Sequence, residues 1–322
     1  MKNETRKIKE KAVAGKVYSG IGGQAVMEGV MMRSGSKYAV AVRLPDKSIH
    51  IDEKTDNFDQ NPWLKVPIIR GMVSFFYSLV TGIQSLMTSA NYFEDDEETK
   101  AKKAKMTEEE KKKMESRELW GSFAFSLIVA VLVFFLLPYG LSKLMGRLIP
   151  NRFAVTALEG LIRVLIFLVY ILLISGMEDI KRVFMYHGAE HKCINCVENG
   201  LPLTVLNVKK STRLHKRCGT SFIFIVMIIS IFVFMFIRSS NPLMQILLRL
   251  LLIPVVAGIS YEFIRWAGRS ENPVVNLLSK PGLALQKLTT REPDDDMIEV
   301  GIASVEAVFD WKAFQEKNKD KF

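Results

Sequence analysis

Long apolar runs without charge alternate with charge-dense segments, and this segregation constrains the fold of the 322-residue chain more than any other feature. Residues 119–142 form a run of 24 uncharged residues, and 218–237 form one of 20. At about 1.5 Å per residue, helices of these lengths are long enough to span the roughly 30 Å hydrocarbon core of a bilayer. Two further apolar runs, 154–176 and 242–261, carry only isolated charges. The pattern predicts a mainly α-helical polytopic membrane protein with about four transmembrane helices between residues 119 and 266.

The distribution of Lys and Arg predicts how these helices are oriented. Eight lie in the twenty residues before the first run and eight in 178–217, whereas 143–153 carries three. Because Lys and Arg concentrate in cytoplasmic loops, we expect both termini and 178–217 to face the cytoplasm and the protein to reside in the plasma membrane.

The net charge of +10 follows from the same rule and from attraction to anionic lipid. No basic motif interleaved with aromatic residues points to nucleic acid. We therefore expect the lipid bilayer to be the main partner. Other membrane proteins, and further copies of this chain, are possible additional partners.

The terminal segments predict a small cytoplasmic α+β cap. Within 17–62, apolar and polar residues alternate at 38–43 and 48–52 around Pro45-Asp46-Lys47, which is typical of a β-hairpin. The C-terminal segment, 267–322, is expected to be helical. After the acidic residues at 294–296, it places apolar side chains on one helical face that we expect to pack on the cap: Ile298, Ile302, Val305 and Phe309.

Three segments connect or precede these parts. Residues 1–16 are charged and predicted to be flexible. Residues 63–93 are apolar but diluted by polar residues, which favours an amphipathic or re-entrant helix. Residues 94–118 change from acidic to lysine-rich, which is typical of a charged linker or an exposed helix.

The predicted cytoplasmic loop 178–217 and the residue after it hold a concentration of metal-ligand types. If the segment around His187 and His191 is helical, the two imidazoles lie one turn apart and can bind one metal ion. Glu190 lies beside them and could act as a ligand or as a general base. The order His-x-x-Glu-His is also that of inverted zinc peptidases.

Further candidate ligands follow closely. His215 and Cys218 form an H-x-x-C, and Cys193 and Cys196 form a C-x-x-C that could supply additional ligands. A tetrahedral site needs only four ligands, so the sequence predicts a divalent metal, zinc above others. The alternative is a metal-free loop in which the histidines cap helices and the cysteines fill the core.

Charged residues inside the apolar runs form a second set of candidates. Glu159 and Arg163 are spaced to pair on one helix, Arg249 lies within the last run, and Glu262 follows that run. Charges within a membrane mark a functional site by default. Mutual pairing that merely holds the bundle together is the alternative.

Four motifs, spread in order over residues 17–310, resemble those of the YqhQ-like bacterial membrane proteins, a family defined by domain of unknown function 1385. The motifs are Gly22-Gly23-Gln24-Ala25-Val26-Met27-Glu28-Gly29-Val30-Met31-Met32-Arg33, Tyr186-His187-Gly188-Ala189-Glu190-His191-Lys192, Arg217-Cys218-Gly219-Thr220-Ser221-Phe222 and Leu288-Thr289-Thr290-Arg291-Glu292-Pro293.

The resemblance implies a metal-dependent enzyme without a settled reaction. The residues of this chain that match are His187, Glu190, His191, His215 and Cys218. Cys193 and Cys196 lie outside the shared motifs, and Lys216 stands where the family pattern has proline.

Three functions of different classes are consistent with these features. The first is a metal-dependent hydrolase that acts near the membrane, with Glu190 as the base. The second is a non-enzymatic scaffold or assembly factor in which zinc fixes the loop to the bundle. The third is a small-solute transporter that uses Glu159, Arg163 and Arg249 as a polar path.

Overall fold

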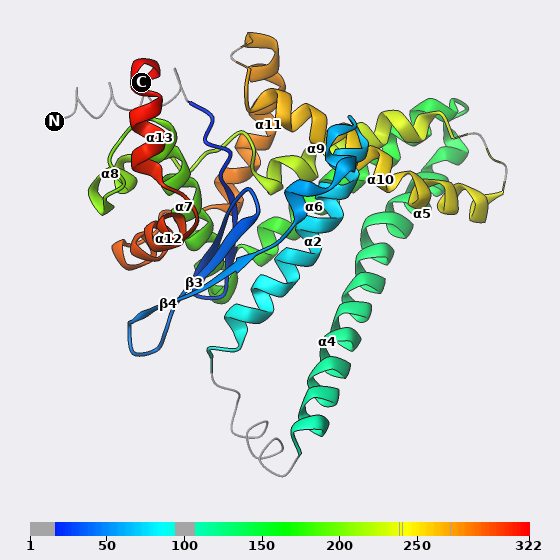
Figure 1. Cartoon of the computed structure of the whole chain (residues 1–322). Helices are drawn as coiled ribbons and strands as arrows, with labels where there is room; N and C mark the ends of the chain where they lie inside the picture. The colour runs from blue at the N-terminus through cyan, green and yellow to red at the C-terminus, as the bar shows by residue number, and fades with distance from the viewer. Residues whose placement is uncertain (1–16, 94–106, 238, 240, 271) are drawn as a thin grey trace.

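A small sheet covered by helices lies at one end of the protein and a group of long apolar helices at the other (Figure 1). The computed structural model describes residues 17–93 and 107–322, except 238, 240 and 271. The predicted flexible segment 1–16 lies outside the described residues. So does most of the predicted linker 94–118, whose end forms the start of a helix.

The sheet is an antiparallel meander in the order β1-β2-β3-β4. Its strands are β1 (Gly22–Val26), β2 (Gly29–Ser34), β3 (Lys37–Arg43) and β4 (Ile49–Thr55). β3 and β4 form the hairpin that the alternation at 38–52 predicts. The glycine-rich run forms the other two strands, joined by a tight turn in which Glu28 has a φ of 46°.

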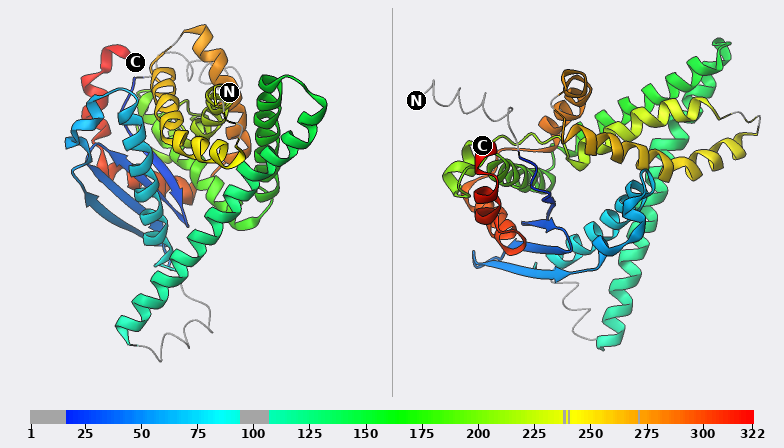
Figure 2. Two further views of the ribbon diagram at one scale, coloured as in Figure 1. Left: turned by 90° about the vertical axis from the view of Figure 1, so that its right-hand side faces the viewer. Right: turned by 45° about the horizontal axis from the view of Figure 1, so that its top comes forward.

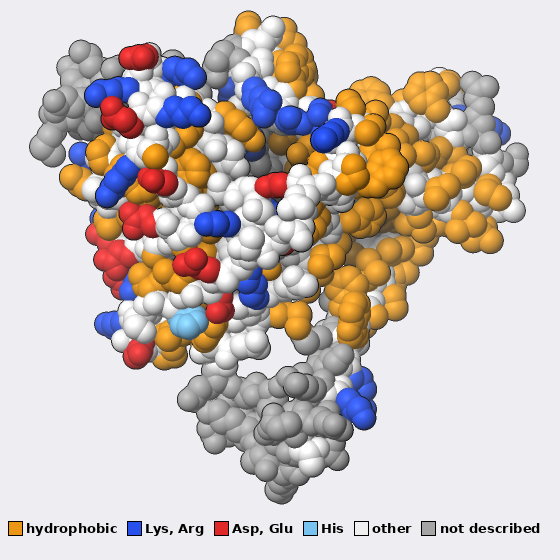
Figure 3. Space-filling model, viewed as in Figure 1, with side chains coloured by type: hydrophobic (Ala, Val, Ile, Leu, Met, Phe, Trp, Pro, Cys, Tyr) orange, Lys and Arg blue, Asp and Glu red, His pale blue; other side chains and the backbone are white. Residues whose placement is uncertain are grey.

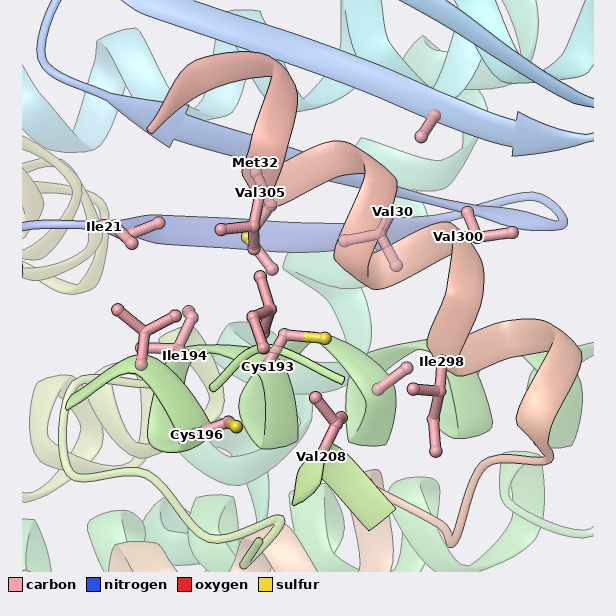
Figure 4. Packing of buried hydrophobic residues seen from close by; sticks show 14 of the residues in the cluster. Ile21, Val30, Met32, Cys193, Ile194, Cys196, Val208, Ile298, Val300 and Val305 are labelled. Atoms are coloured by element: carbon pink, nitrogen blue, oxygen red, sulfur yellow. The ribbon is translucent and has the colours of Figure 1, made fainter. Parts of the chain in front are cut away.

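Alternate residues of the two central strands, β2 and β3, point to opposite faces of the sheet. Each face is buried in its own apolar cluster. Val30, Met32, Ala39 and Ala41 join a core that includes Ile194. Figure 4 shows this core between β2, the helix that carries Ile194 and the helix that carries Ile298. The opposite face has its own cluster, which consists of Val26, Met31, Tyr38, Val40 and Val42.

Four helices complete the cap on the side of the first core. They are α7 (Glu178–Glu198), α8 (Val205–Lys210), α12 (Asp295–Val308) and α13 (Trp311–Lys317). The Asp294 carboxylate accepts a hydrogen bond from the Met297 N–H, which caps α12 as its acidic start predicts. Ile298 and Val305 of α12 are fully buried, and α12 packs on β2, β3 and α7 (Figure 2).

Helix α2 (Ile69–Ala90) lies within the predicted segment 63–93 and links the sheet to the apolar helices. Its first turn packs on a later helix at Gly71, where an added Cβ would lie 2.9 Å from the Cα of Gly258. Its second half packs on the sheet, where the Gln24 amide donates to the carbonyl of Gly82. Large apolar side chains such as Phe76 and Val80 point outward.

Among the described residues, three helical segments are long and apolar enough to cross a membrane. They are Trp120–Leu148, Arg152–Ile174 and Pro242–Ala267. The first runs through α4 (Glu108–Val131), a π-helical turn (Leu132–Leu136) and α5 (Leu137–Met145). The other two are α6 and α10. Figure 3 shows that the surface of the apolar helices is largely hydrophobic.

The fourth apolar run forms a shorter helix than the sequence predicts. Helix α9 (Gly219–Met235) has 17 residues, or about 26 Å at 1.5 Å per residue. It packs between α6, α10 and α11 (Pro273–Thr289). Short 3₁₀ turns complete the described chain at Phe58–Gln60, Pro62–Lys65, Gly146–Leu148 and Lys319–Lys321.

Candidate metal centre

The segment predicted as a cytoplasmic loop is built mainly from helix α7, and this helix presents His187, Glu190 and His191 together. The two histidines lie one turn apart as predicted, with ring centroids 4.4 Å apart. Gly188 lets another segment cross α7 here, because an added Cβ would lie only 2.0 Å from the carbonyl oxygen of Arg291. The histidines are therefore fixed against the chain that leads from α11 to α12.

Cys218 brings a third ligand from a different element. It is the N-cap of α9, and its Sγ accepts a hydrogen bond from the Thr220 N–H at 3.4 Å. The same sulfur lies 3.2 Å from Nε2 of His187. One ligand atom each from His187, His191 and Cys218 fall within 4.8 Å of one another, a spacing that one metal ion could bridge.

Backbone carbonyl groups orient both imidazoles. Nδ1 of His187 lies 2.9 Å from the carbonyl oxygen of Thr289, and Nδ1 of His191 lies 2.6 Å from that of Arg213. A carbonyl oxygen can only accept, so each Nδ1 carries the proton and donates it. In a neutral ring the lone pair is then on Nε2, which is the nitrogen that would bind a ligand.

The electrostatic interactions between Cys218 and the two histidines favour the protonation states that metal ligands require. Burial would raise the pKa of the Cys218 thiol, but the adjacent rings of His191 and His187 lower it well below its usual value. Burial would lower the pKa of His187, but the Cys218 sulfur raises it to about 9. The cluster therefore favours a thiolate, which is the form of cysteine that binds metals. A metal ion would replace the proton shared by this pair.

Glu190 lies beside the three ligands, buried from solvent. Its Oε2 is 3.9 Å from Nε2 of His187. Burial raises the pKa of this carboxyl group above its usual value, although a backbone hydrogen bond from Gly23 opposes the rise. Strand β1 thus holds Glu190 within reach of the position where a ligand of the metal would lie.

His215 lies next to His191 but is not one of the three grouped residues. Its ring centroid is 5.6 Å from that of His191, but its Nε2 faces Glu198 Oε2 at 3.5 Å. Its backbone N–H donates to the Gln286 side chain, whose amide donates back to the His215 carbonyl. Burial lowers the pKa of His215 to about 4. The structure therefore groups three of the four predicted ligands.

Cys193 and Cys196 belong to the cap core. Both are fully buried among apolar residues under α12. An added Cβ at Gly301 of that helix would lie 2.9 Å from the Cys193 sulfur. The Cys196 thiol donates toward the carbonyl oxygen of Pro202 at 3.5 Å, and burial raises its pKa to about 12. The additional ligands predicted from the C-x-x-C lie outside the cluster.

Glu198, at the end of α7, is a further buried charged residue of this region that was not among the predicted site residues. Its carboxylate accepts from the N–H and hydroxyl of Ser19, at 3.0 and 2.8 Å, and pairs with Arg217 at 2.5 Å. Glu198 lies one heptad after His191 on α7, so helical spacing could have indicated it.

The charges within the apolar helices pair with one another. Glu159 contacts both Arg163 and Arg249, whereas Glu262 accepts from Arg70 of α2 and from the Ile68 N–H. Mutual pairing, which the sequence left as an alternative, is present for Glu159, Arg163 and Arg249, whereas Glu262 pairs with an arginine of α2.

Comparison with known proteins identifies relatives whose function is equally undefined. The sequence model of one family, described as protein of unknown function (DUF1385), matches residues 66–311. The uncharacterized protein YqhQ of Bacillus subtilis is 37% identical over 312 residues, which cover 94% of this chain and 96% of the relative. No solved structure matches.

Proposed function

The chain belongs to the DUF1385 family of proteins of unknown function, and from its own residues we propose that it is a membrane protein with a zinc-type metal centre that catalyses hydrolysis near the membrane surface. His187, His191 and Cys218 would bind the ion, and Glu190 would act as the base. This proposed ligand set has three members, whereas the sequence predicted four, because His215 is not grouped with the others.

The observation that carries the proposal is the pair of carbonyl groups behind the histidines. Metal-binding histidines commonly donate their second N–H to a carbonyl or carboxylate, which fixes the tautomer and aims the other nitrogen. Thr289 and Arg213 provide this for both rings, at 2.9 and 2.6 Å. Two imidazoles held in this way beside one thiol form a donor set that suits zinc.

Three protein ligands favour catalysis, because a tetrahedral ion then keeps one position for water or substrate. An ion in this position would supply Lewis-acid chemistry. Glu190 would accept a proton on Oε2, which lies 3.9 Å from Nε2 of His187. Its burial supports this role, because burial raises the pKa of this carboxyl group and so makes its carboxylate a stronger base.

The position of the centre supports a substrate at the membrane surface. Cys218 directly precedes α9, and the chain enters α7 four residues after α6 ends at Ile174. We propose that the apolar helices cross the plasma membrane and that the cap, the centre and both termini lie in the cytoplasm, where the excess of Lys and Arg predicts them. A lipid head group or a membrane-proximal peptide would then reach the centre.

A structural role for the ion is the main alternative to a catalytic role. The two roles differ in whether Glu190 is a ligand of the ion. If Glu190 binds the ion as a fourth ligand, the site is closed and the ion fixes α7 to the start of α9. The protein would then be a zinc-stabilised scaffold or assembly factor for other membrane proteins.

Metal analysis of the purified full-length protein tests the proposal. We expect about one zinc per chain, with one sulfur near 2.3 Å and nitrogen or oxygen ligands near 2.0–2.1 Å by X-ray absorption. Cys218→Ser should remove the sulfur signal and most of the metal. Cys196→Ser removes a buried thiol outside the cluster and serves as the matched control. Zinc-free wild type, or a sulfur signal that persists in Cys218→Ser, would refute the metal centre.

A Glu190→Gln variant then separates the two roles. In a catalytic site it should retain zinc and an unchanged number of ligands, because glutamine keeps the volume but cannot accept the proton. In a structural site it should lose one oxygen ligand and much of its metal affinity.

A further inference from the structure

A second polar cluster lies inside the apolar helices, away from the metal centre. Glu159 and Arg163 belong to α6 and Arg249 to α10, and only 3, 5 and 7% of their surfaces are exposed. Glu159 lies seven residues after the first residue of α6, and Arg249 lies seven after the first residue of α10. Both are therefore about 10 Å along their helices from the end of the bundle opposite the cap.

The cluster contains more positive than negative charge. Oε1 of Glu159 accepts from Arg163 at 2.8 Å and from Arg249 at 2.5 Å. Within the described part of the chain, Glu159 is the one carboxylate that pairs with either guanidinium group. One carboxylate and two guanidinium groups leave one positive charge uncompensated. A buried charge of this kind is costly within a bilayer unless a counter-charge is present.

Arg163 and Arg249 differ in how their nitrogens are satisfied. Arg163 donates to Glu159, to the Phe134 carbonyl at 2.9 Å and toward the Ser230 hydroxyl at 3.4 Å. Arg249 donates to Glu159, but its Nε is buried without a hydrogen-bond partner. A buried donor usually has a partner, and within the described residues this Nε has none, so a group from outside the chain would satisfy it.

Aromatic rings and a hydroxyl group surround the two guanidinium groups. The Arg249 guanidinium lies 5.2 Å from the ring of Tyr139, and both guanidinium groups lie 5.6 Å from that of Phe234. The Phe134 carbonyl that accepts from Arg163 belongs to the π-helical turn, a type of distortion that is frequent at functional sites. The cluster is thus a site assembled from four segments of the bundle: the π-helical turn with α5, and the helices α6, α9 and α10.

We propose that Arg163 and Arg249 bind a phosphate group on the side of the bundle opposite the cap. A planar guanidinium donates two parallel hydrogen bonds to phosphate oxygens, and the negative charge would compensate the excess. The phosphate could belong to the head group of an anionic lipid or to free phosphate. This inference depends on the proposed membrane placement and is independent of the metal centre.

Thermal unfolding of the delipidated full-length protein in a neutral detergent tests the site. We expect a saturable rise in Tm with short-chain phosphatidylglycerol, with inorganic phosphate at constant ionic strength, or with both. A rise with the lipid alone identifies a head group, and a rise with both identifies any accessible phosphate. Either result supports the site.

Matched arginine variants show whether the cluster causes the effect. Arg249→Met leaves Glu159 and Arg163 as a neutral pair, so the bundle should fold while the apparent affinity falls at least about tenfold. Arg147→Met removes an exposed arginine near the same end and should keep the wild-type response. Glu159→Gln raises the excess charge and should tighten binding.

The inference is overturned if neither phosphate nor phosphatidylglycerol raises Tm. An equal response of wild type and Arg249→Met would overturn it as well, because binding would then not involve the cluster.

Discussion

Nδ1 of His191 lies 2.6 Å from the carbonyl oxygen of Arg213, a residue 22 positions further along the chain. His187 makes the corresponding contact with Thr289, 102 positions away. Neither ring is oriented by its own helix. The arrangement of the candidate ligands therefore exists only when α7, the segment before α9 and the end of α11 are assembled, so metal binding at this proposed centre would be coupled to the tertiary fold.

Chelation should destabilise the protein through this coupling. A ligand that binds only the folded state stabilises it by about 2.7 kcal/mol at 100 times its Kd, so metal removal should lower Tm by several degrees. Differential scanning fluorimetry before and after dialysis against a chelator measures the change, and added zinc should reverse it. The same treatment of Cys218→Ser should have little effect. A chelator response of wild-type size in that variant would contradict the assignment of Cys218.

Gly188→Ala should displace the segment that orients His187. The new methyl group would lie 2.0 Å from the carbonyl oxygen of Arg291, two residues after Thr289, so this segment must move. We expect a loss of about 1–3 kcal/mol in stability and a roughly 10–100-fold loss in metal affinity.

Zinc competition titrations and denaturant unfolding measure both effects. Gly176→Ala is the control, because the nearest atom to its added methyl group is 3.5 Å away. Equal zinc affinities for the two variants would show that the Arg291 segment does not position the site.

Glu198→Gln should loosen the N-terminal segment from the metal centre. The carboxylate is 2% exposed, pairs with Arg217 and accepts two hydrogen bonds from Ser19. Removal of one partner of a buried pair typically costs about 3–5 kcal/mol. Hydrogen exchange should accelerate at residues 17–20 together with this loss.

Glu299→Gln provides the comparison for that variant. Glu299 also pairs with an arginine, Arg43, but its side chain is 50% exposed, so the cost should not exceed about 1 kcal/mol. Similar losses in the two variants would mean that burial of Glu198 does not determine its contribution.

The fold was predictable where a periodic pattern determines burial. Alternation identified the β3–β4 hairpin, and helical spacing identified the buried face of α12 with Ile298 and Val305. The glycine-rich strands β1 and β2 were not predicted, because their burial depends on α7 and α12, which follow much later in the chain. The one-turn spacing of His187 and His191 indicated a helix here, but it did not indicate that α7 extends from Glu178 to Glu198 and packs on α12.

The candidate site was predictable in its ligand types but not in its organisation. Spacing on one helix placed His187 and His191 together, and the H-x-x-C order indicated Cys218. The contact of His215 with Glu198 was not visible, because no periodic pattern relates these two positions. The contacts of the two histidines with the carbonyl groups of Thr289 and Arg213 could not be predicted from residue type, because every residue has a backbone carbonyl group.

Asp56→Asn tests how the sheet is attached to α2. The Asp56 carboxylate accepts two hydrogen bonds of 2.9 Å from Arg33 of β2 and one from the Tyr77 hydroxyl of α2. Asparagine keeps the shape but loses the charge and one acceptor, so we expect a loss of about 1–3 kcal/mol at neutral pH. Asp59→Asn, an exposed change three residues away, should have almost no effect.

The pH dependence of this difference gives the sharper measurement. Burial would raise the pKa of Asp56, but the bonds from Arg33 and Tyr77 lower it below the ordinary value of 3.8. The stabilisation is therefore complete above pH 3.8 and is lost as the pH falls through the lower pKa of the folded protein. Unfolding of wild type and Asp56→Asn across this range should show two stabilities that converge at acid pH. A constant difference would show that the charge of Asp56 does not contribute to the attachment.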